Sequence, residues 1–185
     1  DMHTVCNCEQ NIVDISSEDG KMSPHHMITT TIGDEIQLFN PKSKVIGISL
    51  KDRGAILSAG HSADAAYWMN GNGDWITSSF YMDNLPDWLI QYQNQTPTSS
   101  FIESDWSFGD EFSHNLDSLI NLKGYGIIKS TPYGNTILAD LALEILENEN
   151  LGRDNLTDLL TISFSSTDYI GHRYGPHSME IFDTY

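Results

Sequence analysis

Two cationic side chains follow a short apolar run near residue 50. Lys51 and Arg53 flank Asp52 directly after residues 45–50. If this segment is extended, residues two apart point the same way, and both cations face one anion. Arg presents a planar fork to phosphate oxygens, and Lys presents a compact point charge. The pair therefore indicates a phosphate site; the alternative is that both cations only pair with Asp52 and the surrounding acids.

A carboxylate and an imidazole stand four residues apart near the other end of the chain. Asp168 and His172 follow a second apolar run, residues 159–164. One helical turn would place both side chains on the same face, because residues four apart are neighbours on a helix. Oxygen and nitrogen ligands suit Zn²⁺. The alternative is an Asp that caps a helix and a His at the surface.

The two apolar runs are the elements that must position these side chains. Residues 45–50 and 159–164 are short and contain no charged residue, which is typical of strands buried on both faces of a parallel sheet. Helical segments separate them, so we expect an α/β fold with helices on the faces of the sheet. Ligands bind outside the carboxyl ends of such strands. Both polar motifs are expected there, at the same edge.

Helix start signals and a turn signal predict the remaining elements. Ser-Pro and Thr-Pro pairs predict helices that begin near residues 23 and 131, and Pro86 begins a shorter one over 85–94. The first should extend to about residue 39, and residues 178–185 should begin another. The sequence around residues 70–73 predicts a β-hairpin, whereas residues 95–125 look rich in loops. The second Pro-started helix has an apolar face made of Ile137, Leu138, Leu141, Ala142 and Ile145.

Composition sets the limits on partners. The chain carries 26 acids against 9 bases, a formal charge of −17, so it should repel nucleic acid and anionic lipid. The sequence contains no run of 18 apolar residues, the length that would indicate a membrane-spanning helix. Cys6 and Cys8 are too close in sequence for an unstrained disulfide, and they are either ordinary thiols or metal ligands together with His3. His61 and the four tryptophans are expected to have structural roles.

Longer stretches around both motifs resemble one family. SLKDRGAILSAGH (residues 49–61) is similar to the cation segment of the phosphate-irrepressible alkaline phosphatases, which are relatives of the nucleotide pyrophosphatases and phosphodiesterases. SSTDYIGHRYGP (residues 165–176) resembles a zinc-ligand segment of the same family, and STPYGNT (residues 130–136) is also family-like. The motifs occur in the family's order, which makes the resemblance specific.

The resemblance implies a fold, a reaction and roles for four residues. The fold would be part of an alkaline-phosphatase-like parallel-sheet sandwich with a β-hairpin insertion. Residues 1–185 would form an internal portion of one catalytic domain, with 22–185 family-like and 1–21 irregular. The family hydrolyses phosphate monoesters with two zinc ions and a threonine that becomes phosphorylated. Lys51 and Arg53 match its phosphoryl-contacting cations, and Asp168 and His172 match two ligands of one zinc.

The same resemblance places other parts of the site outside this sequence. The nucleophilic threonine and the remaining zinc ligands match no residue here, so the chain is expected to be inactive alone and to need the missing parts of its own catalytic domain. Such enzymes work in the bacterial periplasm or are secreted. The alternatives are a phosphodiesterase or nucleotide pyrophosphatase of the same superfamily, and a non-catalytic binding module. Two cations favour a dianionic monoester over a diester.

Overall fold

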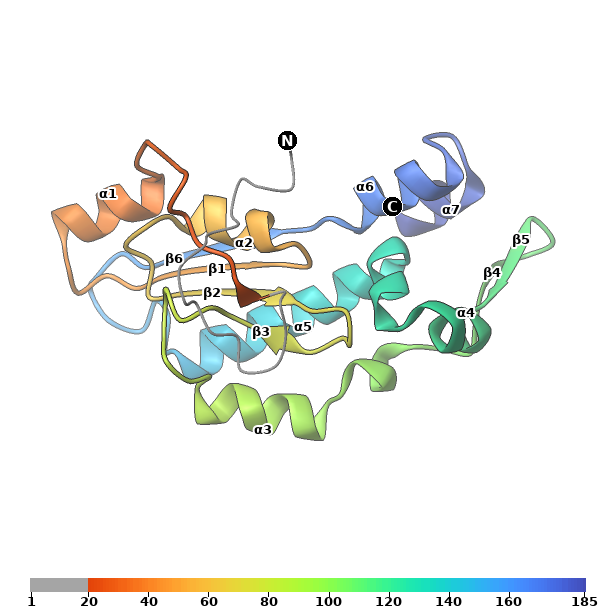
Figure 1. Ribbon diagram of the computed structural model, residues 1–185, viewed down its shortest axis with the longest axis horizontal. Coiled ribbons are helices and arrows are strands. Elements are labelled where there is room, and N and C mark those ends of the chain that lie inside the picture. Colours follow the sequence, from red (N-terminus) through yellow and green to blue (C-terminus); the bar gives the residue numbers. More distant parts are fainter. Residues whose placement is uncertain (1–19) are drawn as a thin grey trace.

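A four-stranded sheet forms the centre of the structure, a computed structural model in which residues 20–185 are described (Figure 1). Its strands lie in the order β3, β2, β1, β6, with β1 parallel to both of its neighbours and β3 antiparallel to β2. The bounds are β1 (Val45–Ser49), β2 (Ala65–Met69), β3 (Trp75–Ile76) and β6 (Leu159–Ser163). Both predicted strands and the α/β class are confirmed. Cys6, Cys8 and His3 lie outside the described residues.

Helices cover both faces of this sheet. α1 (Ile32–Phe39) and α2 (Asp52–Ala59) lie on one face, and α3 (Asp87–Gln95) and α5 (Pro132–Asn148) lie on the other (Figure 1). Side chains of β1 alternate between two cores, because successive residues of a strand point to opposite faces. Val45 packs with Ile56 of α2, whereas Ile46 packs with Leu138 of α5. The result is a three-layer α/β/α arrangement.

The helix predicted from Thr131-Pro132 is α5. Pro132 is its first residue, where its missing N–H is tolerated. The predicted apolar face is buried in the larger core, as shown by the low exposure of Ile137, Leu138, Leu141, Ala142 and Ile145. The Thr-Pro start signal and the hydrophobic periodicity together therefore located the main helix and its contact face. α3, which begins after Pro86, is confirmed in the same way.

The predicted hairpin is present, and it belongs to the main sheet. Trp68 pairs with Ile76, and Met69 pairs with Trp75. The side-chain oxygen of Asn70 accepts hydrogen bonds from the backbone N–H of Asn72 and of Asp74, which closes the turn. Because β2 also pairs with β1, the hairpin extends the central sheet instead of standing apart as an insertion.

Residues 95–125, expected to be rich in loops, contain regular elements. They comprise η3 (Thr98–Phe101), β4 (Asp105–Phe108), β5 (Phe112–Asn115), α4 (Leu116–Lys123) and the start of η4 (Tyr125–Ser130). β4 and β5 form a separate two-stranded sheet beside α6 (Ser166–Tyr174) and α7 (Met179–Thr184) (Figure 1). Trp106 is buried there, and its indole N–H donates to Asp183 at 2.7 Å. The tryptophan is structural, as expected, and α7 confirms the helix predicted over 178–185.

The first helix begins later than predicted. Ser23 and Pro24 form only a turn, in which the Met27 N–H donates to the Pro24 carbonyl at 2.8 Å. α1 begins at Ile32 because Thr31 and Asp34 make a reciprocal capping box. Ile28, which lies within the helix predicted over residues 23–39, is fully exposed. The start at residue 23 was wrong because the Ser-Pro signal describes a local turn as well as it describes a helix.

The second predicted strand is less buried than expected. Among the described strands β6 has a neighbour, β1, on one side only, and it forms one edge of the sheet. Ile162 is 38% exposed and Phe164, just beyond the strand, is 51% exposed. The prediction of burial on both faces was therefore wrong for β6 and right for β1. A sequence run without charges resembles a central strand, but the sheet order decides its burial.

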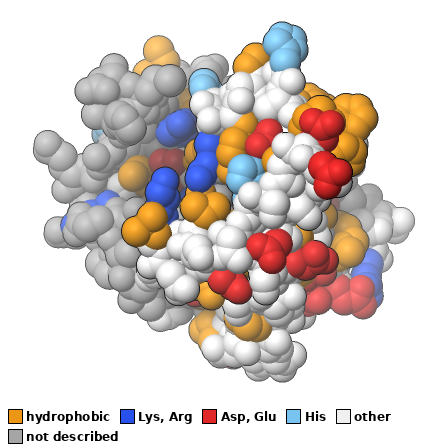
Figure 2. Space-filling model, turned by 90° about the vertical axis from the view of Figure 1, so that its right-hand side faces the viewer, with side chains coloured by type: hydrophobic (Ala, Val, Ile, Leu, Met, Phe, Trp, Pro, Cys, Tyr) orange, Lys and Arg blue, Asp and Glu red, His pale blue; other side chains and the backbone are white. Residues whose placement is uncertain are grey.

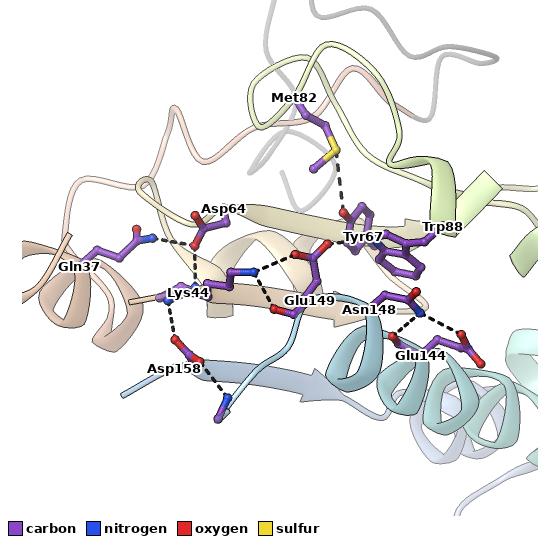
Figure 3. A network of polar contacts seen from close by, with 12 residues as sticks. Gln37, Lys44, Asp64, Tyr67, Met82, Trp88, Glu144, Asn148, Glu149 and Asp158 are labelled. Atoms are coloured by element: carbon purple, nitrogen blue, oxygen red, sulfur yellow. Dashed lines mark hydrogen bonds and ion pairs between the residues drawn. The ribbon is translucent and has the colours of Figure 1, made fainter. Parts of the chain in front are cut away.

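A polar network fixes the amino ends of the strands (Figure 3). The ammonium of Lys44 donates to the carbonyl of Glu149 at 2.6 Å, and the indole of Trp88 donates to the Glu149 carboxylate at 2.9 Å. Asp64 accepts from the backbone N–H of Val45 at 2.7 Å. These contacts join α5, α3 and β2 to the start of β1. They lie at the end of the sheet opposite the predicted site.

Candidate functional site

The four predicted site residues come from two elements that begin at the carboxyl ends of adjacent strands. Lys51 caps the amino end of α2, and Arg53 is the second residue of that helix. Asp168 and His172 lie on α6, which follows β6 after two residues. Because β1 and β6 are parallel neighbours, both helices begin at the same edge of the sheet. The predicted meeting of the two motifs is thus observed in the geometry.

Asp168 is the residue at which the two motifs touch. Its Oδ2 accepts a hydrogen bond from the Lys51 ammonium at 2.5 Å, and its Oδ1 lies 3.3 Å from Nε2 of His172. The hydrogen bond from Lys51 lowers the pKa of Asp168, and the charges of Lys51, His172 and Arg53 act in the same direction against desolvation. The carboxylate therefore stays ionised and available to a cation.

The local backbone around Lys51 differs from the expected extended segment. Only Lys51 has an extended backbone, and the chain turns into α2 at Asp52. The two cations consequently do not project in parallel from a strand. Both still act on Asp168, Lys51 by direct contact and Arg53 through its charge. That both cations bind one anion stays a prediction, and the expected extended segment is replaced by the start of a helix.

A tight contact holds the start of α2 against the strand ends. A Cβ on Gly54 would lie 2.4 Å from Oγ of Ser49 and 3.0 Å from Oγ of Ser163. Only glycine allows this approach, because real Cβ atoms do not come so near to other heavy atoms. Ser49 Oγ also accepts from the backbone N–H of Lys51 at 3.2 Å. The position of Lys51 is therefore set by packing on both β1 and β6.

Tyr169 is a site residue that sequence reasoning missed. The Lys51 ammonium lies 4.3 Å from the centroid of its ring. Burial raises the pKa of Tyr169, so the side chain is a neutral phenol. Tyr169 follows Asp168 in the sequence, but neighbours on a helix point in different directions, and no spacing rule connects its ring to a residue of α2.

An open pocket of about 550 Å³ adjoins the pair on α6. Asp168 and His172 line it together with Thr167, Gly171, Pro176, Ile181 and Tyr185. Figure 2 views the end of the molecule where α6 and α7 lie; Lys and Arg side chains gather on one side of it and acidic ones on the other. In a chain of charge −17 this local gathering of cations makes an anion site possible at that end.

The donor chemistry of the pair suits zinc but does not complete a site. Asp168 offers a carboxylate oxygen and His172 an imidazole nitrogen, and the two atoms lie 3.3 Å apart. No cluster of three or more His, Cys, Asp or Glu side chains suited to a metal occurs among residues 20–185. Zinc sites normally have three or four protein ligands. The described residues thus fit one half of a zinc site.

Comparison with known proteins agrees with this geometry. Residues 19–185 match the family described as type I phosphodiesterase / nucleotide pyrophosphatase. The chain belongs to this family. Family membership rests on nearly the whole described chain, including both motifs and the helices that carry them.

Several relatives within this family are named alkaline phosphatases. The chain is 36% identical to alkaline phosphatase PhoV of Synechococcus elongatus, over all of this chain and 38% of the relative. It is 32% identical to alkaline phosphatase PafA of Elizabethkingia meningoseptica, over 92% of this chain and 36% of that protein. A protein of Myroides odoratus named as a calcium-transporting ATPase is 42% identical over 90% of this chain and 36% of its own.

Solved structures of a family member show the same fold. A crystal structure of a quadruple mutant of alkaline phosphatase PafA matches with a TM-score of 0.89 and 30% identity, over 97% of this chain and 41% of that chain. Wild-type PafA matches with a TM-score of 0.83. The chain thus spans about two fifths of the length of these relatives. None of the helices between residues 20 and 185 combines the length and apolar character that crossing a membrane requires.

Proposed function

We propose that this chain contributes phosphate-binding cations and one zinc-binding pair to an alkaline phosphatase, a zinc-dependent hydrolase of phosphate monoesters. The observation that carries the proposal is the contact of Lys51 with Asp168 at 2.5 Å, with His172 beside it, at the carboxyl ends of two parallel strands. Ligand sites of α/β sheets lie there. Membership of a phosphodiesterase and pyrophosphatase family and similarity to named alkaline phosphatases support phosphate esters as substrates.

Lys51 and Arg53 would bind the non-bridging oxygens of the phosphoryl group. A transferring phosphoryl group spreads its charge over three equatorial oxygens, and fixed cations stabilise that charge. The chain has only nine Lys and Arg, so two beside the carboxylate and imidazole are a concentrated positive charge. When phosphate binds, the Lys51 ammonium can turn its remaining N–H groups to the phosphate while Asp168 keeps one of them.

Asp168 and His172 would hold one of two zinc ions. Zinc, when bound, stabilises the attacking and leaving oxygens of an in-line displacement. Asp168 and His172 would present one oxygen and one nitrogen to that ion, at a separation set by their positions on α6. The Oδ1 to Nε2 distance of 3.3 Å is short enough for both atoms to face the same ion. Their remaining partners, and the nucleophile, would come from other parts of a longer protein.

A phosphodiesterase is the second candidate, because the family's name includes that activity. The two cations distinguish the candidates. A monoester carries two negative charges at its end and gains more from extra positive charge than a diester with one. The positive charges of Lys51 and Arg53 both lower the pKa of Asp168, and this concentration of positive charge favours the monoester. A non-catalytic binding module, the third candidate, predicts a protein without any dependence on zinc.

The test is the ratio of monoester to diester hydrolysis in a protein of the relatives' length that carries this chain. Lys51→Ala combined with Arg53→Ala should lower kcat/KM for an aryl phosphate monoester by 10²-fold or more, in the range measured for a lost charge-stabilising donor, and affect a matched diester far less. Lys42→Ala combined with Arg153→Ala is the control, since both are exposed cations near the opposite end of the sheet. An unchanged ratio would remove the assignment of Lys51 and Arg53. Zinc content by elemental analysis separates the enzyme from the binding module.

The enzyme's proposed place of work is the bacterial periplasm or the medium outside the cell. This rests on the kinship with alkaline phosphatases. The strongly acidic composition suits an exported hydrolase of small phosphate esters, and it disfavours nucleic acid as a substrate.

A further inference from the structure

We propose that Tyr169 is a positioning residue that holds the ammonium of Lys51 in place for phosphate binding. The proposal rests on the proposed function and deepens it, because it names what aims one of the two cations. Tyr169 and Asp168 are consecutive residues of α6, and both contact Lys51 of α2. The helix that carries the zinc-binding pair would thereby also set the place of the phosphate-binding cation.

The two contacts with Lys51 differ in what they do to its charge. Asp168 accepts a hydrogen bond at 2.5 Å and brings a full negative charge, which offsets the positive charge that phosphate needs. The ring of Tyr169, 4.3 Å from the ammonium, attracts the cation through its quadrupole and carries no net charge. Tyr169 can therefore hold Lys51 without neutralising it. This matters most when Asp168 is engaged by a metal ion.

Partial burial and a backbone hydrogen bond restrict the position of Tyr169. The side chain is half-buried, and its backbone N–H donates to the Ser165 carbonyl at 3.2 Å in the first turn of α6. The charge of Arg53 also acts on its hydroxyl, in the direction that opposes burial. One aromatic side chain thus lies within the influence of both cations of α2. Its ring contacts the ammonium of Lys51.

Without this support Lys51 would have a long and flexible stem. Only 16% of its side-chain surface is exposed, although it ends beside an Asp168 side chain that is 53% exposed. A lysine that must be ordered on binding loses affinity, whereas one already held in place does not. A cation–π contact at a partly exposed site corresponds to a 2- to 5-fold change in affinity, so about that loss is expected when the ring is removed.

The experiment follows the ε-methylene of Lys51 by NMR in the whole 185-residue chain, with its signal assigned by its absence in Lys51→Arg. Three variants are compared with wild type: Tyr169→Leu, Tyr169→Phe and Tyr174→Leu. Tyr174 is the matched control, because it lies on the same helix but stacks on His114 with centroids 4.8 Å apart. Inorganic phosphate is then titrated into each variant, and amide spectra check that each is folded.

The ring should shift the Lys51 signal upfield, and the shift should disappear in Tyr169→Leu but persist in Tyr169→Phe and Tyr174→Leu. Phosphate should bind Tyr169→Leu about 2- to 5-fold more weakly, with affinity restored in Tyr169→Phe. A Lys51 signal that is unchanged in a folded Tyr169→Leu would overturn the inference, as would an equal loss of phosphate affinity in Tyr174→Leu. If wild type shows the ring shift but no phosphate affinity, the role of the contact in phosphate binding is overturned, whereas the proposed function is judged separately by the monoester-to-diester ratio of the longer protein.

Discussion

At the scale of single residues, carboxylates in this chain are used in two ways that the structure separates clearly. Asp168 is half-exposed and accepts from a lysine, so its charge remains accessible at the candidate site. Asp34 is almost fully buried and accepts four hydrogen bonds, from the backbone N–H and the hydroxyl of Thr31 and of Ser62. The first arrangement suits ligand binding, whereas the second fastens α1 to the loop after α2.

Asp34 makes stability depend on acid pH. Burial alone would raise its pKa, but the hydrogen bonds from Ser62 and Thr31 outweigh burial and lower the pKa to about 2 from an ordinary value of 3.8. A lowered pKa means that its stabilisation is complete above pH 4 and is lost as the pH falls toward 2. The loss amounts to about 2 kcal/mol of unfolding free energy.

Denaturant unfolding between pH 5 and pH 2 measures this effect. Asp34→Asn should be less stable than wild type at pH 5 and show a smaller loss on acidification. Asp117→Asn is the control. It removes an exposed carboxylate from the first turn of α4 and should follow wild type. Parallel curves for wild type and Asp34→Asn would show that Asp34 does not carry the acid sensitivity.

At the scale of elements, the start of α2 depends on close packing that a larger residue would break. Gly54→Ala would place a Cβ 2.4 Å from Ser49 Oγ and 2.9 Å from Ser49 Cβ. The helix start must then move away from the strand ends, at a cost of about 1–3 kcal/mol. Thermal unfolding measures the loss. Gly126→Ala is the matched control, because nothing lies within 4 Å of the added methyl group there, and a similar loss in both variants would count against the packing argument.

The elements also show how far sequence could predict this fold. β1, α5 and the hairpin turn were predictable because their signals are local: an uncharged β-branched run, a Pro-started periodic helix and an Asn-Gly turn. The start of α1 was missed, because the Ser23-Pro24 pair is a helix-start signal that here forms only a turn, and the helix begins at the capping box of Thr31 and Asp34. β6 reads like a central strand, and only its place in the sheet order gives it an exposed edge.

The candidate site was predictable to the same degree. The spacing of Asp168 and His172 placed both on one helical face, and the carboxyl-end rule brought Lys51 to them. The helix that begins at Asp52 was not expected, because an Asp between two cations carries no clear helix signal. Tyr169 escaped prediction because its ring contacts Lys51, which lies far away in the sequence. The neighbouring residue Asp168 is 117 positions from Lys51.

At the scale of the whole molecule, the described residues would supply half of a metal site beside a three-layer α/β/α core. Asp168 and His172 supply two donors, and residues 20–185 contain no group of three or more suited to a metal. Two donors bind zinc far more weakly than three or four. We therefore expect this chain alone to bind zinc weakly and to show no metal-dependent hydrolysis of an aryl phosphate.

Calorimetric zinc titration and a phosphatase assay with added zinc test that expectation together. His172→Ala should abolish the residual zinc binding, because one carboxylate remains and Lys51 already donates to it. His177→Ala should not, since this exposed imidazole lies beyond the end of α6 and is not among the residues of the pocket. Metal-dependent turnover by this chain would mean that it holds a nucleophile and further ligands that the geometry of residues 20–185 does not assemble, and the division of the site proposed above would be wrong.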